Sequence, residues 1–201
     1  MAETGEFYGK FVDPLLTRLR TRVASEIESG ETVIDIACGT GAQAFLLATK
    51  AKQVTGIDLS QSMIDFATGK LKNSGERNLS FHLADASRLE IFSDKSFDVA
   101  TMSLALHQFN PGLYEAILAE MKRVANRIII VDYAVPLPKN YAGIGSRIAE
   151  FLAGREHNRN FKAYYESGGL NTILPKHGIE IQKTGHAVKG AFQLVVCEEA
   201  R

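Results

Sequence analysis

Several features that would mark a specialised protein are scarce in these 201 residues. Only two cysteines occur, Cys38 and Cys197, which excludes a disulfide scaffold and favours reduced thiols. No apolar run approaches the ~20 residues that span a bilayer, and the stretch from Ile128 to Val131 is typical. The acidic start, Met1 to Glu6, lacks an apolar segment, so we expect no signal peptide. We therefore expect a cytoplasmic protein without a membrane segment.

An excess of charge is also missing. Lys and Arg together number 23, as do Asp and Glu, so the formal net charge is zero. Proteins that bind phosphate backbones usually carry a basic excess, so nucleic acid is not expected as a partner. Hydrophobic residues make up 45% and charged residues 23%, which is the usage of a globular protein. A chain of this length can form one domain with its own core.

The expected strands and helices alternate along the chain, which is typical of an α/β fold with a mainly parallel sheet. The β-branched run Arg127 to Asp132 is expected to form a central strand that is covered on both faces. Lys189-Gly190, between the last two strands, predicts a terminal antiparallel hairpin. The expected strands are 32–37, 52–57, 79–83, 97–102, 127–132, 179–187 and 193–198, and helices are expected to begin near 13, 41, 61, 110 and 143.

The most informative segment runs from Val33 to Gly41, where an expected strand leads into a glycine-rich turn and a helix. Glycine lets a ligand approach the backbone, and such a turn at the carboxyl edge of a parallel sheet can bind part of a nucleotide-like ligand. Asp58 ends the next expected strand, where its carboxylate can accept hydrogen bonds from both hydroxyls of a ribose. The alternative is that Asp58 caps the helix that begins at Gln61, although Ser60 is available for that purpose.

Two classes of cofactor fit this turn. Gly39 to Ala44 match the G-x-G-x-x-A form of a dinucleotide site, with Asp58 as its acid, which would indicate an NAD-dependent oxidoreductase. Asp35 argues against this class, because a charge inside an apolar strand is costly unless a group of opposite charge pairs with it. A pyrophosphate would repel Asp35, whereas a ligand with an ammonium group would pair with it.

Four segments together resemble the successive motifs of class I S-adenosylmethionine-dependent methyltransferases. They read VIDIACGTG, GIDLSQSMI, HLADASRL and FDVATMSLALHQF, and the similarity in order and spacing extends from about Glu31 to Pro136. The remaining tail is similar to small bacterial members of the group that includes the ubiquinone/menaquinone-type methyltransferases. The sequence departs from the first motif at Ala37, where glycine is commoner.

The resemblance implies a fold, a cofactor and a reaction. The implied fold is a Rossmann-like, doubly wound sheet of seven strands in the order 3-2-1-4-5-7-6, with strand 7 antiparallel and helices on both faces. The implied cofactor is S-adenosylmethionine, with S-adenosylhomocysteine as its product. The implied reaction is an in-line transfer of the methyl group to an oxygen, nitrogen or carbon of a small-molecule acceptor, driven mainly by positioning. A non-catalytic module that binds S-adenosylmethionine is a further alternative.

The resemblance also implies which residues bind the methionine part of the cofactor. Asp35 would hold the ammonium group, and the turn at Ala37, Gly39 and Gly41 would lie against the methionine and ribose parts. Ser103 stands where members of the family offer backbone atoms to the ammonium group.

For the nucleoside part, the resemblance assigns Asp58 to the ribose hydroxyls, and Leu59 and Met63 to packing on the adenine. Asp85 would accept from the adenine amino group, while the backbone N–H of Ala86 serves a ring nitrogen. The alternatives are that Met63 fills a gap in the core and that Asp85 closes an Asx turn.

His107 is the candidate catalytic base, because the stretch from Ser103 to Phe109 leaves the fourth expected strand beside the methyl group. A base is needed only for a hydroxyl or a protonated amine, and a structural histidine that bonds a loop carbonyl is the alternative. Asp132 and Tyr133 leave the fifth strand at the same edge. The five histidines form no close pair of ligands, so no metal is expected.

The whole chain is expected to be one methyltransferase domain. Its four segments would be a helical cover (1–30), in which Tyr8 folds over the cofactor, a cofactor-binding core (31–136), a helical cover of the acceptor pocket (137–177) and the terminal hairpin (178–201). The third segment carries Arg155 and Arg159 among aromatic residues, which would suit a carboxylated or phosphorylated aromatic acceptor. The alternative is a solvated, charged helix face. A monomer and a homodimer both stay open.

Overall fold

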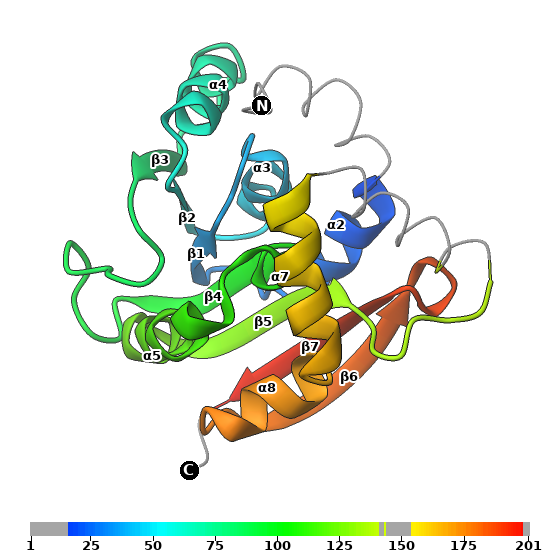
Figure 1. Cartoon of the computed structure of the whole chain (residues 1–201). Coiled ribbons are helices and arrows are strands. Elements are labelled where there is room, and N and C mark those ends of the chain that lie inside the picture. Colours follow the sequence, from blue (N-terminus) through cyan, green and yellow to red (C-terminus); the bar gives the residue numbers. More distant parts are fainter. Residues whose placement is uncertain (1–15, 141–142, 144–153, 199–201) are drawn as a thin grey trace.

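The computed structural model describes residues 16–140, 143 and 154–198, and its centre is one seven-stranded sheet of order β3-β2-β1-β4-β5-β7-β6 (Figure 1). The neighbours from β3 to β5 pair in parallel, whereas β7 is antiparallel to both β5 and β6. The predicted order and the antiparallel last strand are confirmed. The strands are β1 (Thr32–Ile36), β2 (Gln53–Asp58), β3 (Leu79–Leu83), β4 (Phe97–Ser103), β5 (Ala125–Tyr133), β6 (Ile181–Ala187) and β7 (Phe192–Glu198).

Helices cover both faces of the sheet. In Figure 1, α5, α7 and α8 lie on the near side of the sheet, and α2 and α3 lie on the far side. Helix α2 packs on α3, α5 packs on β4 and β5, and α8 packs on β6. These helices and α4 have the bounds α2 (Thr17–Ala24), α3 (Ala42–Ala48), α4 (Gln61–Lys72), α5 (Tyr114–Val124), α7 (Arg155–Glu166) and α8 (Leu170–Lys176).

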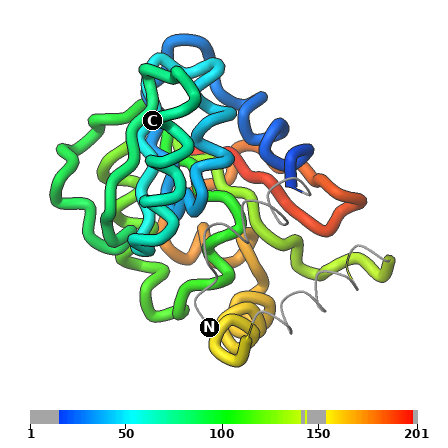
Figure 2. The backbone as a smooth tube through the Cα atoms, turned by 90° about the horizontal axis from the view of Figure 1, so that it is seen from above, coloured from blue at the N-terminus to red at the C-terminus, as the bar shows by residue number. Residues whose placement is uncertain are grey.

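The sequence predicts helical structure over residues 143–176 with interruptions at Gly154, Gly168 and Gly169, and the described part of this range contains the two helices α7 and α8. Gly168 and Gly169 have φ angles of 86° and 64°, which end α7 and let the chain turn into α8. Helix α2 ends at Ala24, earlier than the Ser29-Gly30 stop that the pattern predicts, and the expected start near residue 13 lies outside the described residues. Seen from above in Figure 2, α4 (cyan) and the β6–β7 hairpin (orange to red) lie on opposite sides of the molecule.

Three short 3₁₀ helices complete the described chain. Two of them, η3 (Leu106–Gln108) and η4 (Pro111–Leu113), follow β4, and η5 (Val188–Gly190) joins β6 to β7. Helix α7 packs on η3, so the segment after β4 is held between the sheet and a helix.

The middle of the sheet is part of the buried core. In β5 the residues from Ile128 to Val131 are buried, and the strand lies between β4 and β7. This confirms the expected central strand covered on both faces. The sheet order reverses beside β1, which pairs with β2 on one side and β4 on the other. The carboxyl ends of these strands therefore border a crevice, the usual ligand site of a doubly wound sheet.

Candidate functional site

A cavity of about 390 Å³ lies at the carboxyl ends of β1, β2, β3 and β4. Its wall also includes part of α2 and the segment that follows β4. The predicted cofactor residues that line it are Asp35, Ala37, Gly39, Asp58, Leu59, Met63, Asp85, Ala86 and Ser103. Gly41 and His107 are not part of this lining, and Tyr8 lies outside the described residues.

Asp35 lies in β1 between Gly56 and Thr101 of the neighbouring strands and is only 1% exposed. The Thr101 hydroxyl donates a hydrogen bond of 2.7 Å to Asp35 Oδ1, while Asp35 Oδ2 has no partner among the described residues. Burial raises the pKa of Asp35 to about 7, although the Thr101 hydrogen bond and the charge of Arg20 oppose the shift. A cationic ligand group at Oδ2 would restore the ionised form.

Buried side-chain oxygens without a hydrogen-bond partner gather at this cavity. Within the described ranges these atoms are Asp35 Oδ2, Gln43 Oε1, Ser103 Oγ and the Tyr114 hydroxyl, and the first three belong to residues of the cavity wall. A buried polar atom without a partner costs about 1–3 kcal/mol, so such atoms are rare outside functional sites. The observation fits a polar ligand whose amino-acid part reaches this wall.

The glycine turn serves two different purposes. Gly39, at φ 53°, borders open space, because a Cβ added there would have no atom within 4 Å. A Cβ on Gly41, at φ 75°, would lie 2.5 Å from the ring of Phe81. Gly39 therefore leaves room for a ligand, whereas Gly41 leaves room for a side chain of β3.

Asp58 holds the turns after β1 and β2 together. Its Oδ2 accepts the N–H of Gly39 at 2.8 Å, and its Oδ1 accepts the N–H of Ser60 at 2.8 Å. Each carboxylate oxygen has a second lone pair, so both still have room for a ribose hydroxyl. Ser60 is the N-cap residue of α4, but its side chain makes no capping hydrogen bond, unlike the expectation from the sequence.

The segment after β3 also combines a turn with a free acceptor. Asp85 Oδ1 accepts from the N–H and the hydroxyl of Ser87, at 2.8 and 2.7 Å, which is the Asx turn foreseen as the alternative. Asp85 Oδ2 makes no hydrogen bond among the described residues and remains available to a ligand at the cavity. Leu59 and Met63 line the same cavity, and Leu59 is 68% exposed, which leaves an apolar surface for a ring to cover.

His107 is 2% exposed and is held by Asp132. Its Nδ1 lies 2.6 Å from Asp132 Oδ1, and its backbone N–H donates to Asp132 Oδ2 at 3.1 Å. The ring packs against Tyr133, His157, Phe161 and Tyr164, at centroid distances between 4.8 and 6.3 Å. The Asp132 carboxylate is thus a partner of the ring nitrogen Nδ1. The proposed role as a base stays a prediction.

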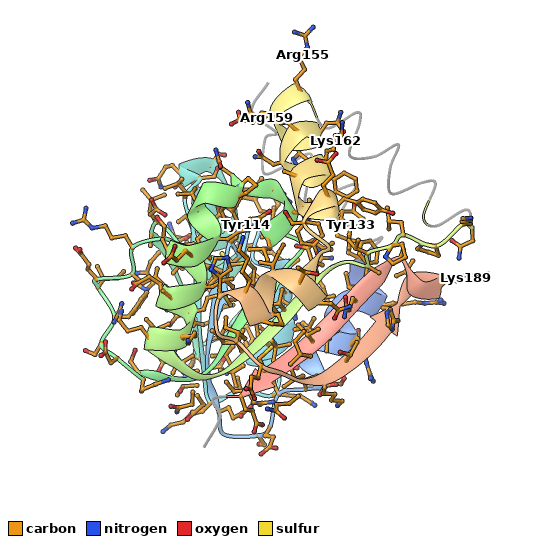
Figure 3. All side chains as sticks on the ribbon, turned by 60° about the horizontal axis from the view of Figure 1, so that its bottom comes forward. Tyr114, Tyr133, Arg155, Arg159, Lys162 and Lys189 are labelled. Atoms are coloured by element: carbon orange, nitrogen blue, oxygen red, sulfur yellow. The ribbon has the colours of Figure 1, made fainter. Side chains whose placement is uncertain are left out.

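The charged residues of α7 mostly face solvent. Figure 3 shows Arg155 and Arg159 projecting from the outside of α7, with Arg155 at its tip. Arg159 lies 3.7 Å from Glu156 and Lys162 lies 3.8 Å from Glu166, and all four of these side chains are exposed. This arrangement is the solvated helix face of the alternative, and residues 144–153 lie outside the described part of the chain.

No helix of the described residues is both long and apolar enough to cross a membrane. The same residues contain no group of three or more His, Cys, Asp or Glu side chains that could hold a metal ion.

Comparisons with known proteins identify the family. A sequence family described as "Methyltransferase domain" matches residues 33–127. The demethylmenaquinone methyltransferase of Thermotoga maritima is 32% identical over 183 residues, which cover 83% of this chain and 75% of that protein. The chain belongs to the class I S-adenosylmethionine-dependent methyltransferases.

Other relatives of the methyltransferase agree with this assignment. Methyltransferase GfsG of Streptomyces halstedii is 28% identical over 204 residues, covering 98% of this chain and 70% of that protein. A methyltransferase structure from Aquifex aeolicus aligns with a TM-score of 0.68 at 20% identity, covering 95% of this chain and all (100%) of that one. Magnesium protoporphyrin IX methyltransferase from Synechocystis, solved with bound S-adenosylhomocysteine, aligns at 0.63 and 18% identity, covering 94% and 83%.

The cofactor of this methyltransferase is S-adenosylmethionine, and the NAD-dependent alternative is set aside. The residues of the cavity fit this cofactor on their own chemistry. A buried carboxylate oxygen without a partner matches the ammonium group, a second carboxylate matches the ribose, and an exposed leucine matches the adenine.

Some cavity residues of the methyltransferase were missed in the sequence. Leu19 and Arg20 come from α2, and Gln108 and Phe109 come from the segment after β4. Their place depends on how a helix and a loop dock, for which the sequence has no local signal. Gln43 had such a signal, because it is a polar residue in the apolar helix that follows the glycine turn.

Proposed function

We propose that this chain transfers the methyl group of S-adenosylmethionine to a small-molecule acceptor. The observation that carries the proposal is the cavity at the carboxyl ends of β1, β2 and β4, with Asp35 buried and half-satisfied in its wall. The named relatives support a small acceptor, since their names refer to a quinone and to a porphyrin. Residues 137–177 are the proposed cover of the acceptor pocket.

Within this proposal the two ends of the cofactor are bound in different ways. Asp35 holds the ammonium group at the methionine end, beside Ala37, Gly39 and Ser103. At the nucleoside end, Asp58 binds the ribose hydroxyls.

The adenine is proposed to lie on Leu59 and Met63. Asp85 Oδ2 accepts from its amino group, and the N–H of Ala86 meets a ring nitrogen. All four residues line the cavity and follow the neighbouring strands β2 and β3, which is the support for this placement.

The chain's own contribution to the rate is mainly positioning. S-adenosylmethionine supplies a methyl group that is already activated for an in-line transfer, so the residues of the cavity have to orient it and exclude water. The chain removes a proton only if the acceptor is a hydroxyl or a protonated amine.

His107 is our candidate for this proton transfer, and Asp132 is a positioning residue. The Asp132 carboxylate accepts the Nδ1–H, so the unprotonated nitrogen of neutral His107 is Nε2. His107 is buried and outside the cavity lining, so its role as a base requires an acceptor that reaches beyond this cavity to the ring.

The test is a turnover assay with a panel of acceptors. The purified chain is incubated with S-adenosylmethionine and, separately, with a reduced naphthoquinone, a simple phenol and an aromatic amine, while release of S-adenosylhomocysteine is followed. We expect release that depends on one acceptor class. Tight binding of S-adenosylhomocysteine without release for any acceptor would contradict the proposal and indicate a binding module.

The variant His107→Ala tests whether this histidine acts as the base or whether the rate depends on positioning alone. For a hydroxyl acceptor we expect kcat to fall about 100-fold or more in His107→Ala, with the affinity for S-adenosylhomocysteine within about twofold of the parent. For a carbon acceptor that is already ionised, kcat stays within about tenfold.

A further inference from the structure

The cavity wall contains a hydrogen-bond acceptor, Gln43, that lies outside the four motif segments quoted above. Gln43 is the second residue of α3, is 4% exposed and belongs to the cavity wall. Its Nε2 donates a hydrogen bond of 3.3 Å to the carbonyl oxygen of Arg20 in α2. This bond orients the amide, so Oε1 is the atom left without a partner within the described residues.

The chemistry of the unpartnered atoms restricts the group that can satisfy them. An ionised Asp35 Oδ2 and the Gln43 Oε1 can only accept hydrogen bonds. Ser103 Oγ can donate as well as accept, so it fits either end of an amino acid. A ligand carboxylate brings no donor for Asp35 and Gln43, whereas an ammonium group brings three N–H donors.

We propose that Gln43 Oε1 and Asp35 Oδ2 together bind the ammonium group of the methionine moiety, so that Gln43 makes the cavity selective for ligands with an intact α-amino group. Two of the three N–H donors then go to these oxygens, and the third is left for the Ser103 side of the cavity wall. The inference rests on the cofactor of the family and not on the proposed acceptor.

The geometry also separates this role from a purely structural one. Gln43 uses opposite ends of its amide for α2 and for the ligand. A substitution that removes only the donor therefore affects the contact with α2, and a substitution that removes both ends affects both contacts.

The experiment is calorimetric titration with two ligands. S-adenosylhomocysteine carries the whole amino-acid part, and 5′-methylthioadenosine keeps the nucleoside and the thioether without it. In Gln43→Met we expect the affinity for S-adenosylhomocysteine to fall about 10- to 100-fold, because a hydrogen bond to a charged group is lost. The affinity for 5′-methylthioadenosine should stay within about twofold.

Gln43→Glu and Gln53→Met are the matched variants. Gln43→Glu keeps an oxygen acceptor and removes the donor to Arg20, so it should bind S-adenosylhomocysteine within about threefold of the parent, or more tightly. Gln53→Met replaces an exposed glutamine at the start of β2 and should change neither affinity.

Two results would overturn the inference. One is that Gln43→Met weakens both ligands equally, and the other is that Gln43→Glu and Gln43→Met weaken S-adenosylhomocysteine to the same extent. Both would mean that Gln43 acts only by holding α2. Thermal unfolding of each variant shows that the protein compared is folded.

Discussion

Asp35 is a carboxyl group that is buried in the cavity wall. Its position between Gly56 and Thr101 removes it from water, and Thr101 satisfies only one of its two oxygens. Burial thus raises the pKa of Asp35 to about 7, and in the binding mode that we propose the ammonium group of the cofactor stabilises the ionised carboxylate. At the scale of single residues, binding is therefore coupled to a proton.

We expect the affinity for S-adenosylhomocysteine to depend on pH. Below about pH 7 the free protein holds a proton on Asp35, which must leave before the carboxylate pairs with the ammonium group. The affinity should rise up to about tenfold per pH unit toward pH 7 and level off above it. Calorimetry at pH 6, 7 and 8 tests this, and Asp35→Asn should bind weakly with no such dependence. A flat profile in the parent protein would contradict the coupling.

The raised pKa of Asp35 gives the stability of the protein the opposite pH dependence from the affinity. Because the pKa of Asp35 is raised in the folded state, the folded protein binds more protons than the unfolded chain between about pH 4 and pH 7. The free energy of unfolding of the ligand-free protein should therefore fall as the pH rises through this range. In denaturant titration at pH 8, the free energy of unfolding of Asp35→Asn should exceed that of the parent by about 1–3 kcal/mol. Near pH 4 the two free energies should be equal.

Ala37 has a φ of 56°, a left-handed conformation that costs a residue with a Cβ about 1–2 kcal/mol. This strain explains why glycine is commoner at this position in the family motif. We expect Ala37→Gly to raise the free energy of unfolding by about 0.5–1 kcal/mol in denaturant titration. Ala163→Gly, inside α7, is the control and should lower it by about 1 kcal/mol.

At the scale of elements, the glycine turn is shaped by a strand that follows it much later in the chain. The ring of Phe81 in β3 occupies the space beside both Gly41 and Gly56, where an added Cβ would lie within 2.5 and 2.6 Å of it. The turn after β1, the strand β2 and the strand β3 are therefore fitted to one aromatic side chain. A glycine in a ligand-binding motif can thus be required for packing as well as for binding the ligand.

A crossed pair of substitutions separates these two requirements. Gly41→Ala should lower the free energy of unfolding by about 2–4 kcal/mol, because it meets Phe81 and has a positive φ. Gly39→Ala should cost only about 1–2 kcal/mol, because its Cβ meets nothing, but it should weaken S-adenosylhomocysteine more than Gly41→Ala does. Phe81→Leu should recover part of the Gly41→Ala loss. The opposite ranking of affinities would place Gly41 at the ligand.

The elements also show what the sequence could and could not predict. Alternating patterns predicted every strand of the sheet, because each strand leaves a local signal, and Asp35 was evident as a charge among apolar neighbours. The break at Gly168-Gly169 was visible as an interruption but not as a boundary between two helices. The orientation of His107 toward Asp132 depends on the turn η3, and the place of Arg20 depends on the docking of α2. Such tertiary placements leave no periodic pattern in the sequence.

At the scale of the whole molecule, the cavity is lined by residues of seven described elements and by the segment that follows β3, and so binding of the cofactor should stabilise the entire fold. At about 100 times its dissociation constant, S-adenosylhomocysteine should add about 2.7 kcal/mol. For a chain of this size that corresponds to a rise of about 5–10 °C in the unfolding temperature. NAD at the same concentration should cause no shift. A rise in the unfolding temperature with NAD alone would contradict the assignment of S-adenosylmethionine as the cofactor.

The carboxylate of Asp58 ties the turns after β1 and β2 before any ligand arrives. If Asp58 binds the ribose as we propose, the nucleoside end of the cavity is preorganised, and little conformational entropy is lost there on binding. The amino-acid end differs, because its buried acceptors await a partner. Adenosine lacks the amino-acid part and so makes no contact with Asp35. Its affinity should be weaker than that of S-adenosylhomocysteine and should not depend on pH. Recognition of the nucleoside should therefore depend on shape, whereas recognition of the amino-acid part should depend on the protonation state of Asp35.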